Sequence, residues 1–284
     1  MYFPLWSVKP IVALDLQHAI AKRILHGRLG LAPVENPRRV LDLGTGTGIW
    51  AIEFGKLNSG CRFIAERGRV LTCILRSVAE QYPNSQVLGT DLSPIFPDRI
   101  PSNCLFMIAN IQEDWDYGQT FDYVHGRYLC AYLNDFPSLF KSIHDSLRPG
   151  GWVEFQETIL HFQAIDGTLE GTALQRWNTL LLQGIREMGR DALSAARYKD
   201  WMADAGFVNI QEQMFAVPMN PWARGNDEKA LGRMQMKNML DGLDGITQSI
   251  FSRAFGWSQQ EIDTLLVDVR RDIQDRNIHA YVPM

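Results

Sequence analysis

The chain has 284 residues, of which 46% are hydrophobic, and carries a formal net charge of -4 at pH 7. This length suffices for one large domain, and the slightly acidic balance lacks the basic footprint of a nucleic-acid-binding protein. No apolar stretch approaches the roughly 18 residues that a membrane-spanning helix requires. We therefore expect neither nucleic acid nor a membrane as a partner.

The N-terminal residues and the cysteines indicate the cellular compartment that we expect. Residues 1–10 lack the continuous apolar core and the cleavage site of a signal peptide. The cysteines form no Cys-x-x-Cys pair and have no histidine at metal-binding spacing, so we expect reduced thiols in a cytosolic or nuclear protein and no metal. They are Cys61, Cys73, Cys104 and Cys130.

The first elements that we expect are a helix over residues 11–29 and a strand, tight turn and helix over residues 39–54. Val40, Leu41 and Leu43 form a short apolar run, after which glycines occupy alternate positions and apolar residues resume at helical spacing. Glycine lets the backbone turn sharply and approach a ligand closely. The N–H groups at the start of the following helix point to the same place.

The residues of this turn favour one class of ligand. A dinucleotide-binding turn is also rich in glycine, but it requires Gly-x-Gly-x-x-Gly, which the spacing of Gly44, Gly46 and Gly48 does not fit. Asp42 precedes the turn, at a place where a carboxylate would repel a pyrophosphate. The same carboxylate would suit a ligand that carries an ammonium and a sulfonium group.

Four further strands alternate with helices, which predicts a parallel α/β sheet with helices on both faces. Asp91 ends the second strand, where a carboxylate can accept hydrogen bonds from both hydroxyls of a ribose. It lies 43 residues after Gly48, whereas a unit of this type usually reaches that acid after about 20 residues. We therefore interpret residues 55–79 as an insertion or a translated intron. The four strands are expected at residues 86–90, 104–108, 121–124 and 152–155, with a helix at 139–147.

The pattern changes beyond Glu157, where we expect a helical lid. Ser258 and Glu261 have the spacing of a capping box, which predicts that a helix begins after Ser258. The predicted elements are helices over residues 174–188, 195–205, 231–255 and 259–274 and strands over residues 208–217 and 279–282.

The turn from Asp42 to Gly48 resembles motif I of the class I S-adenosylmethionine (SAM) methyltransferases, and the whole pattern is similar to the LaeA-like branch of fungal methyltransferases. The resemblance implies a Rossmann-like fold with a helical lid and SAM as the cofactor. The segments that carry it are residues 14–18, 44–52, 89–94, 121–127, 149–154, 205–207 and 256–258. The cofactor-binding residues that it implies are Asp42, Gly44, Thr45, Gly46, Gly48, Asp91, Leu92, Asn110, Ile111 and His125.

The chain departs from the family pattern in places. Ala109 and Asn110 stand where the family usually has acids, but the carbonyl of Asn110 can still accept a hydrogen bond from the adenine amino group. The last strand of the family pairs within the main sheet, and we expect the same of residues 279–282. We expect a single domain over residues 1–284, composed of an N-terminal helical segment (1–38), a SAM-binding core (39–157) and a lid with the last strands (158–284).

His125 is the best candidate for a catalytic base, because imidazole titrates near neutral pH and His125 is expected at the C-terminal end of a strand, where open α/β sheets bind ligands. A histidine that is hydrogen-bonded within the protein or lines the cofactor explains it equally well. Arg127 either holds an acidic acceptor or pairs with a carboxylate. Glu157 and His161 are further candidates, for which we otherwise predict surface positions.

Three functions follow as hypotheses. The first is a SAM-dependent methyltransferase that acts on a small-molecule intermediate of fungal secondary metabolism, in the cytoplasm. The second is a nuclear regulator of secondary metabolism that acts through protein partners. The third is a SAM-binding protein without catalysis.

Overall fold

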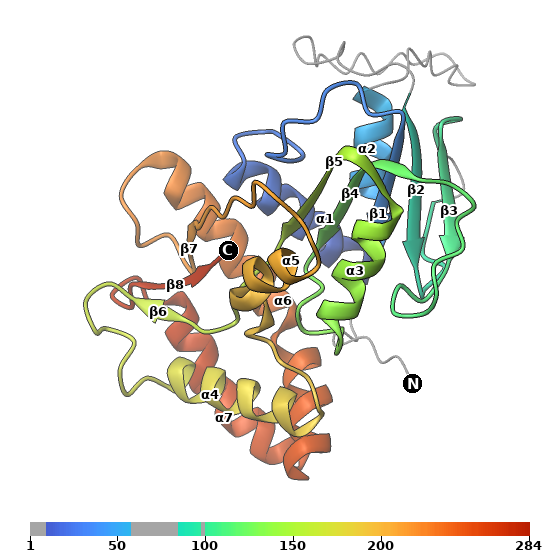
Figure 1. The fold of residues 1–284 in the computed structure, drawn as a ribbon. Helices are drawn as coiled ribbons and strands as arrows, with labels where there is room; N and C mark the ends of the chain where they lie inside the picture. Colours follow the sequence, from blue (N-terminus) through green and yellow to red (C-terminus); the bar gives the residue numbers. More distant parts are fainter. Residues whose placement is uncertain (1–9, 58–84, 98–99) are drawn as a thin grey trace, which may run out of the picture. The chain divides into compact units, whose positions relative to one another are not determined.

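The structure is a computed structural model that describes residues 10–57, 85–97 and 100–284. The chain divides into two compact units. We call residues 29–127 and 142–155 the sheet unit, and residues 1–28, 128–141 and 156–284 the helical unit. Figure 1 gives the labels of the elements. The expectation of a single domain stays a prediction.

A five-stranded sheet, in the order β3-β2-β1-β4-β5, is the centre of the sheet unit (Figure 1). Strand β1 runs parallel to both β2 and β4, and β2 runs parallel to β3. This arrangement confirms the predicted α/β fold with a Rossmann-like parallel sheet. The strands are β1 (Arg39–Leu43), β2 (Gln86–Asp91), β3 (Cys104–Ile108), β4 (Phe121–Arg127) and β5 (Leu147–Gln156).

The apolar run that precedes the glycines forms the core of the sheet unit. Val40, Leu41 and Leu43 of β1 are fully buried, as expected of a central strand that is covered on both faces. Helix α2 (Ile49–Leu57) packs Trp50 and Phe54 into this core. Helix α3 (Phe136–Ser146) and strand β5 contribute residues to both units.

Helix α6 (Asn226–Phe255) is the centre of the helical unit, because it packs against α1, α4 and α7. The Ser258 side chain accepts from the backbone of Glu261, and the Glu261 side chain accepts from the backbone of Ser258, which confirms the predicted capping box. The other helices of this unit are α1 (Pro10–Ile24), α4 (Ala173–Glu187), η1 (Ser194–Arg197), α5 (Tyr198–Asp204) and α7 (Gln259–Gln274).

Three predicted strands differ clearly in length from those of the structure. Strand β5 spans Leu147–Gln156, whereas the sequence predicts residues 152–155. Strand β4 continues through His125 to Arg127, because a buried carboxylate and an aromatic ring accommodate the imidazole inside the sheet. The predicted strand over residues 208–217 is wrong for most of its length, since β7 spans Ala216–Pro218 alone. Val208 and Met214 are exposed, and no described strand pairs with residues 208–214.

The last strand does not join the main sheet. Within the described residues, β8 (Ala280–Pro283) pairs antiparallel with β6 (Gln163–Ala164) and with β7. Ile159 donates its N–H to the carbonyl of Pro283 at 2.9 Å. The expected strand at 279–282 is therefore confirmed, but the expectation that it pairs within the main sheet is wrong.

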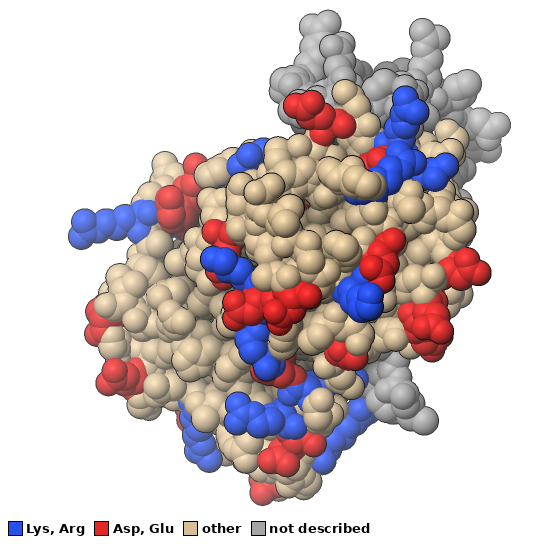
Figure 2. Space-filling model, viewed as in Figure 1, with Lys and Arg blue, Asp and Glu red and all other residues tan. Residues whose placement is uncertain are grey.

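The predicted insertion over residues 55–79 lies mostly outside the described residues. Gly55 is an exception, because it belongs to α2, and a Cβ at this position would lie 2.5 Å from the Cys104 sulfur. None of the helices that the structure describes is long and apolar enough to cross a membrane. Acidic and basic side chains are interspersed among other residues on the face shown in Figure 2.

Candidate functional site

The turn between β1 and α2 has a backbone that favours glycine. Gly44, Gly46 and Gly48 have φ values of 61°, 58° and 75°, in the left-handed region that other residues adopt at a cost. A Cβ on Gly48 would lie 2.5 Å from the ring of Phe106. Sequence reasoning missed this ring, although its place in the short third strand could have suggested it.

Asp91, at the end of β2, is joined directly to this turn. One carboxylate oxygen accepts from the N–H of Gly46 and the other from the N–H of Ser93, both at 2.9 Å. Burial raises the pKa of Asp91 above its ordinary value, and the two N–H groups act in the opposite direction. The structure therefore brings the glycine turn and the predicted ribose acid together. Asp91 also has the role of a turn acid before Ser93.

Asp42 is buried inside the sheet, where two side chains hold its carboxylate. His125 lies directly opposite Asp42 in the pairing of β1 with β4, and its Nδ1 is 2.7 Å from Asp42 Oδ1. The hydroxyl of Thr45 donates to Asp42 Oδ2. His125 is 1% exposed, and two more residues of β4 follow it. The ring is therefore enclosed within the strand.

Leu92, Asn110 and Ile111 follow strands β2 and β3. Leu92 is partly exposed and Ile111 is buried. Asn110 is held in a local turn, because its carbonyl accepts from the N–H of Gln112 at 3.1 Å and its amide donates to Glu113 at 3.0 Å. A carbonyl oxygen has two lone pairs, so Asn110 keeps one acceptor position.

In the helical unit, Glu157 is buried, and the predicted surface position is wrong. Its carboxylate accepts from the N–H of Leu129 at 2.8 Å and from that of Cys130 at 3.3 Å. Burial raises the pKa of Glu157 to about 7. It also raises the pKa values of the nearby Cys130 thiol and Tyr198 phenol. His161 is exposed, as predicted.

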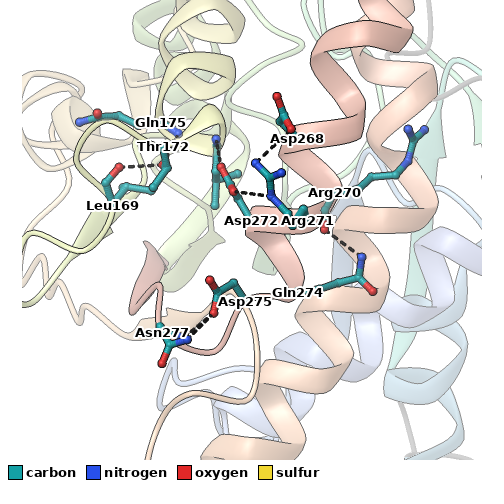
Figure 3. Close-up of polar contacts among 11 residues, drawn as sticks. Leu169, Thr172, Gln175, Asp268, Arg270, Arg271, Asp272, Gln274, Asp275 and Asn277 are labelled. Carbon is teal, nitrogen blue, oxygen red and sulfur yellow. Dashed lines mark hydrogen bonds and ion pairs between the residues drawn. The ribbon is translucent and has the colours of Figure 1, made fainter.

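An open hollow of about 1100 Å³ lies between α4 and α7 of the helical unit. Its polar groups interact with one another, since Arg271 pairs with Asp268 at 3.0 Å and the Asp272 carboxylate accepts from the N–H of Leu174 at 3.1 Å. The hydroxyl of Thr172 accepts from the N–H of Gln175. Of these three contacts, which Figure 3 draws, the one between Asp272 and Leu174 joins α7 to α4, whereas the other two lie within α7 and at the start of α4.

The comparison with protein families decides the class of the chain. Residues 16–212, more than half of the chain, match the model of a methyltransferase domain. The chain belongs to this family. It is a SAM-dependent methyltransferase, and its cofactor is SAM.

Fungal methyltransferases are similar to this one over most of its length. Methyltransferase pytC of Aspergillus terreus is 32% identical over 269 residues, which cover 94% of this chain and 76% of pytC. The probable methyltransferase tdiE of Emericella nidulans is 30% identical, and the alignment covers 95% of this chain and 78% of tdiE. The protein-methionine methyltransferase laeA of the same fungus is 33% identical, and the alignment covers 88% of this chain and 61% of laeA. The predicted relation to LaeA-like proteins is thus confirmed.

Proposed function

We propose that this methyltransferase transfers a methyl group from SAM to a small-molecule intermediate of fungal secondary metabolism. The observation that carries the cofactor site is the 2.9 Å hydrogen bond from the N–H of Gly46 to Asp91, because it joins the glycine turn to the acid that would bind the ribose. The residues that would hold SAM are Asp42, Gly44, Thr45, Gly46, Gly48, Asp91, Leu92, Asn110, Ile111 and His125.

The chemistry of these residues fits SAM part by part. The glycines leave space for the methionine end, and the buried Asp42 carboxylate supplies the negative charge that suits an ammonium and a sulfonium group. Each oxygen of Asp91 accepts one backbone N–H and keeps lone pairs for the ribose hydroxyls. Asn110 keeps one acceptor position for the adenine amino group. Leu92 is partly exposed and would offer apolar surface to the adenine ring.

Bound SAM supplies an activated methyl group, so the protein mainly has to position its ligands. Correct orientation of two reactants can lower a barrier by about 7 to 11 kcal/mol. A base that removes a proton from an O–H or N–H acceptor would add about 10²- to 10⁴-fold. The role of His125 as this base stays a prediction.

The similarity to laeA supports a second candidate function. Relatives with this name are described as a protein-methionine methyltransferase and as a secondary metabolism regulator. On this alternative, the acceptor would be a protein side chain and the chain would regulate secondary metabolism through protein partners in the nucleus. The names of pytC and tdiE state methyl transfer and no acceptor, so they favour neither alternative, and the small-molecule acceptor stays our first proposal.

Calorimetry with SAM tests the cofactor site. We expect Asp91→Ala to weaken SAM binding by about 10- to 100-fold, because charge-assisted hydrogen bonds contribute about 1.5 to 3 kcal/mol. Asp114→Ala is the matched control, since this exposed carboxylate lies in the same unit and should leave the affinity unchanged. An unchanged affinity in Asp91→Ala would remove Asp91 from the site.

Metabolite profiling of a deletion strain distinguishes the two acceptors. A small-molecule enzyme should cause the loss of one methylated product and the accumulation of its unmethylated precursor. Broad silencing of many pathways would instead support the regulatory function and would contradict the proposal of a small-molecule acceptor.

A further inference from the structure

The imidazole of His125 has polar and apolar contacts of very different kinds. Its Nδ1 lies 2.7 Å from Asp42 Oδ1, while its ring stacks on Trp50 with the centroids 3.8 Å apart and the planes 1° from parallel. Trp50 is itself fixed, because its indole N–H donates to the carbonyl of Leu29 at 2.9 Å. The ring of His125 is therefore held in one orientation.

The second ring nitrogen of His125 determines where the proton lies. Nε2 is buried and has no hydrogen-bond partner among the residues that the structure describes. A proton on Nε2 would be a buried donor without an acceptor, which is costly. The Asp42 carboxylate offers an acceptor to Nδ1 instead. The geometry thus favours a proton on Nδ1, directed at the Asp42 carboxylate.

Two donors from different elements hold the two oxygens of the Asp42 carboxylate. The Nδ1–H of His125 in β4 is directed at Oδ1, and the hydroxyl of Thr45 in the glycine turn donates to Oδ2. Asp42 is thereby held in one orientation inside the sheet.

We propose that His125 is a positioning residue, whose Nδ1–H holds the anionic Asp42 in the orientation that receives the positively charged methionine end of SAM. This inference rests on the cofactor site of the proposed function. It explains why a histidine is buried inside a central strand, two residues before its end, with one nitrogen committed to a carboxylate. It also gives His125 a role that needs no contact with the methyl acceptor.

Two substitutions separate the hydrogen bond from the packing of the ring. In His125→Asn the side-chain amide nitrogen occupies a position similar to that of Nδ1 and can donate to Asp42, but the ring that stacks on Trp50 is lost. In His125→Phe the stacked ring is kept, but the donor is lost. We expect calorimetry to show SAM binding within a few-fold of the wild type for His125→Asn and weakened about 10-fold or more for His125→Phe.

A purely structural role predicts that SAM affinity follows ring packing, so that His125→Phe binds better than His125→Asn. That order, equal losses in both variants, or wild-type affinity in His125→Phe would each overturn the inference. If the wild type binds SAM and Asp91→Ala weakens this binding, a negative result for the His125 variants leaves the proposed cofactor site intact. If Asp91→Ala binds as well as the wild type, the cofactor site itself fails.

Nitrogen NMR of the ligand-free wild-type protein tests the proton position without any variant that has to fold. We expect the His125 spectrum to show a proton on Nδ1. A ring whose Nδ1 carries no proton would overturn the proposed arrangement of the Asp42 and His125 pair.

Discussion

The carboxyl group of Glu157 lies in surroundings that favour its neutral form. Burial is the largest influence and raises its pKa to about 7, although two backbone N–H groups act in the opposite direction. The residues that contact it belong to a turn in which Tyr128 has a φ of 56°, an uncommon conformation for a bulky residue. Such conformations persist where the surrounding contacts determine the backbone, and Glu157 supplies two of these contacts.

We expect the stability of the wild type to depend on the ionisation of Glu157. Between pH 4.5, the ordinary pKa of the group, and pH 7, the folded state keeps a proton that the unfolded state has lost. The free energy of unfolding should therefore fall as the pH rises through this window, by on the order of 3 kcal/mol from this group. Glu157→Gln removes the ionisation and should flatten this part of the profile.

Urea unfolding at several pH values between 4.5 and 8 measures this effect. Glu170→Gln is the control, because Glu170 is exposed in the same unit and should leave the wild-type slope unchanged. Parallel profiles for the wild type and Glu157→Gln would show that Glu157 does not titrate in this range.

At the scale of elements, a side chain of another helix accepts a hydrogen bond from the first turn of α4. The N–H groups of the first turn of a helix have no partner within the helix, and two of those in α4 find acceptors elsewhere. Thr172 caps Gln175 from within its own segment, whereas Asp272 of α7 accepts from Leu174 (Figure 3). Asp272 thus links the start of α4 to the last turns of α7.

Asp272→Ala should lower the free energy of unfolding by about 1 to 3 kcal/mol, because it leaves the buried N–H of Leu174 without an acceptor. Asp268, one turn earlier in α7, is the matched control. Its side chain is half exposed and pairs with Arg271 on the surface, so Asp268→Ala should change stability by less than about 0.5 kcal/mol. Equal effects in urea unfolding would contradict a role of Asp272 in joining the helices.

At the scale of the whole molecule, the parallel sheet could be predicted because its strands are short apolar runs. Residues 39–43, 86–91 and 104–108 are bounded by turns or polar residues, and the structure places strands there. Residues 208–217 show a similar pattern, but Val208 and Met214 are exposed. Pairing requires a partner strand, and local sequence does not reveal whether one is present.

The candidate site could be predicted in part. The glycine turn and Asp91 have recognisable spacing, and the structure joins them by a hydrogen bond. The stacking of His125 on Trp50 and the burial of Glu157 depend on contacts between distant segments. From sequence alone, a polar residue that follows a strand is predicted to be exposed unless its buried partner is known. Neither contact could therefore be derived from the sequence pattern.

The division into two units has a consequence for how such chains diversify. The polypeptide passes from one unit to the other four times, after Arg28, Arg127, Lys141 and Phe155. A single genetic crossover therefore cannot exchange the complete helical unit between two genes, because its coding sequence is interrupted twice by that of the sheet unit. We expect relatives with different acceptors to have arisen by substitutions and short insertions within a shared framework, and not by the shuffling of whole modules.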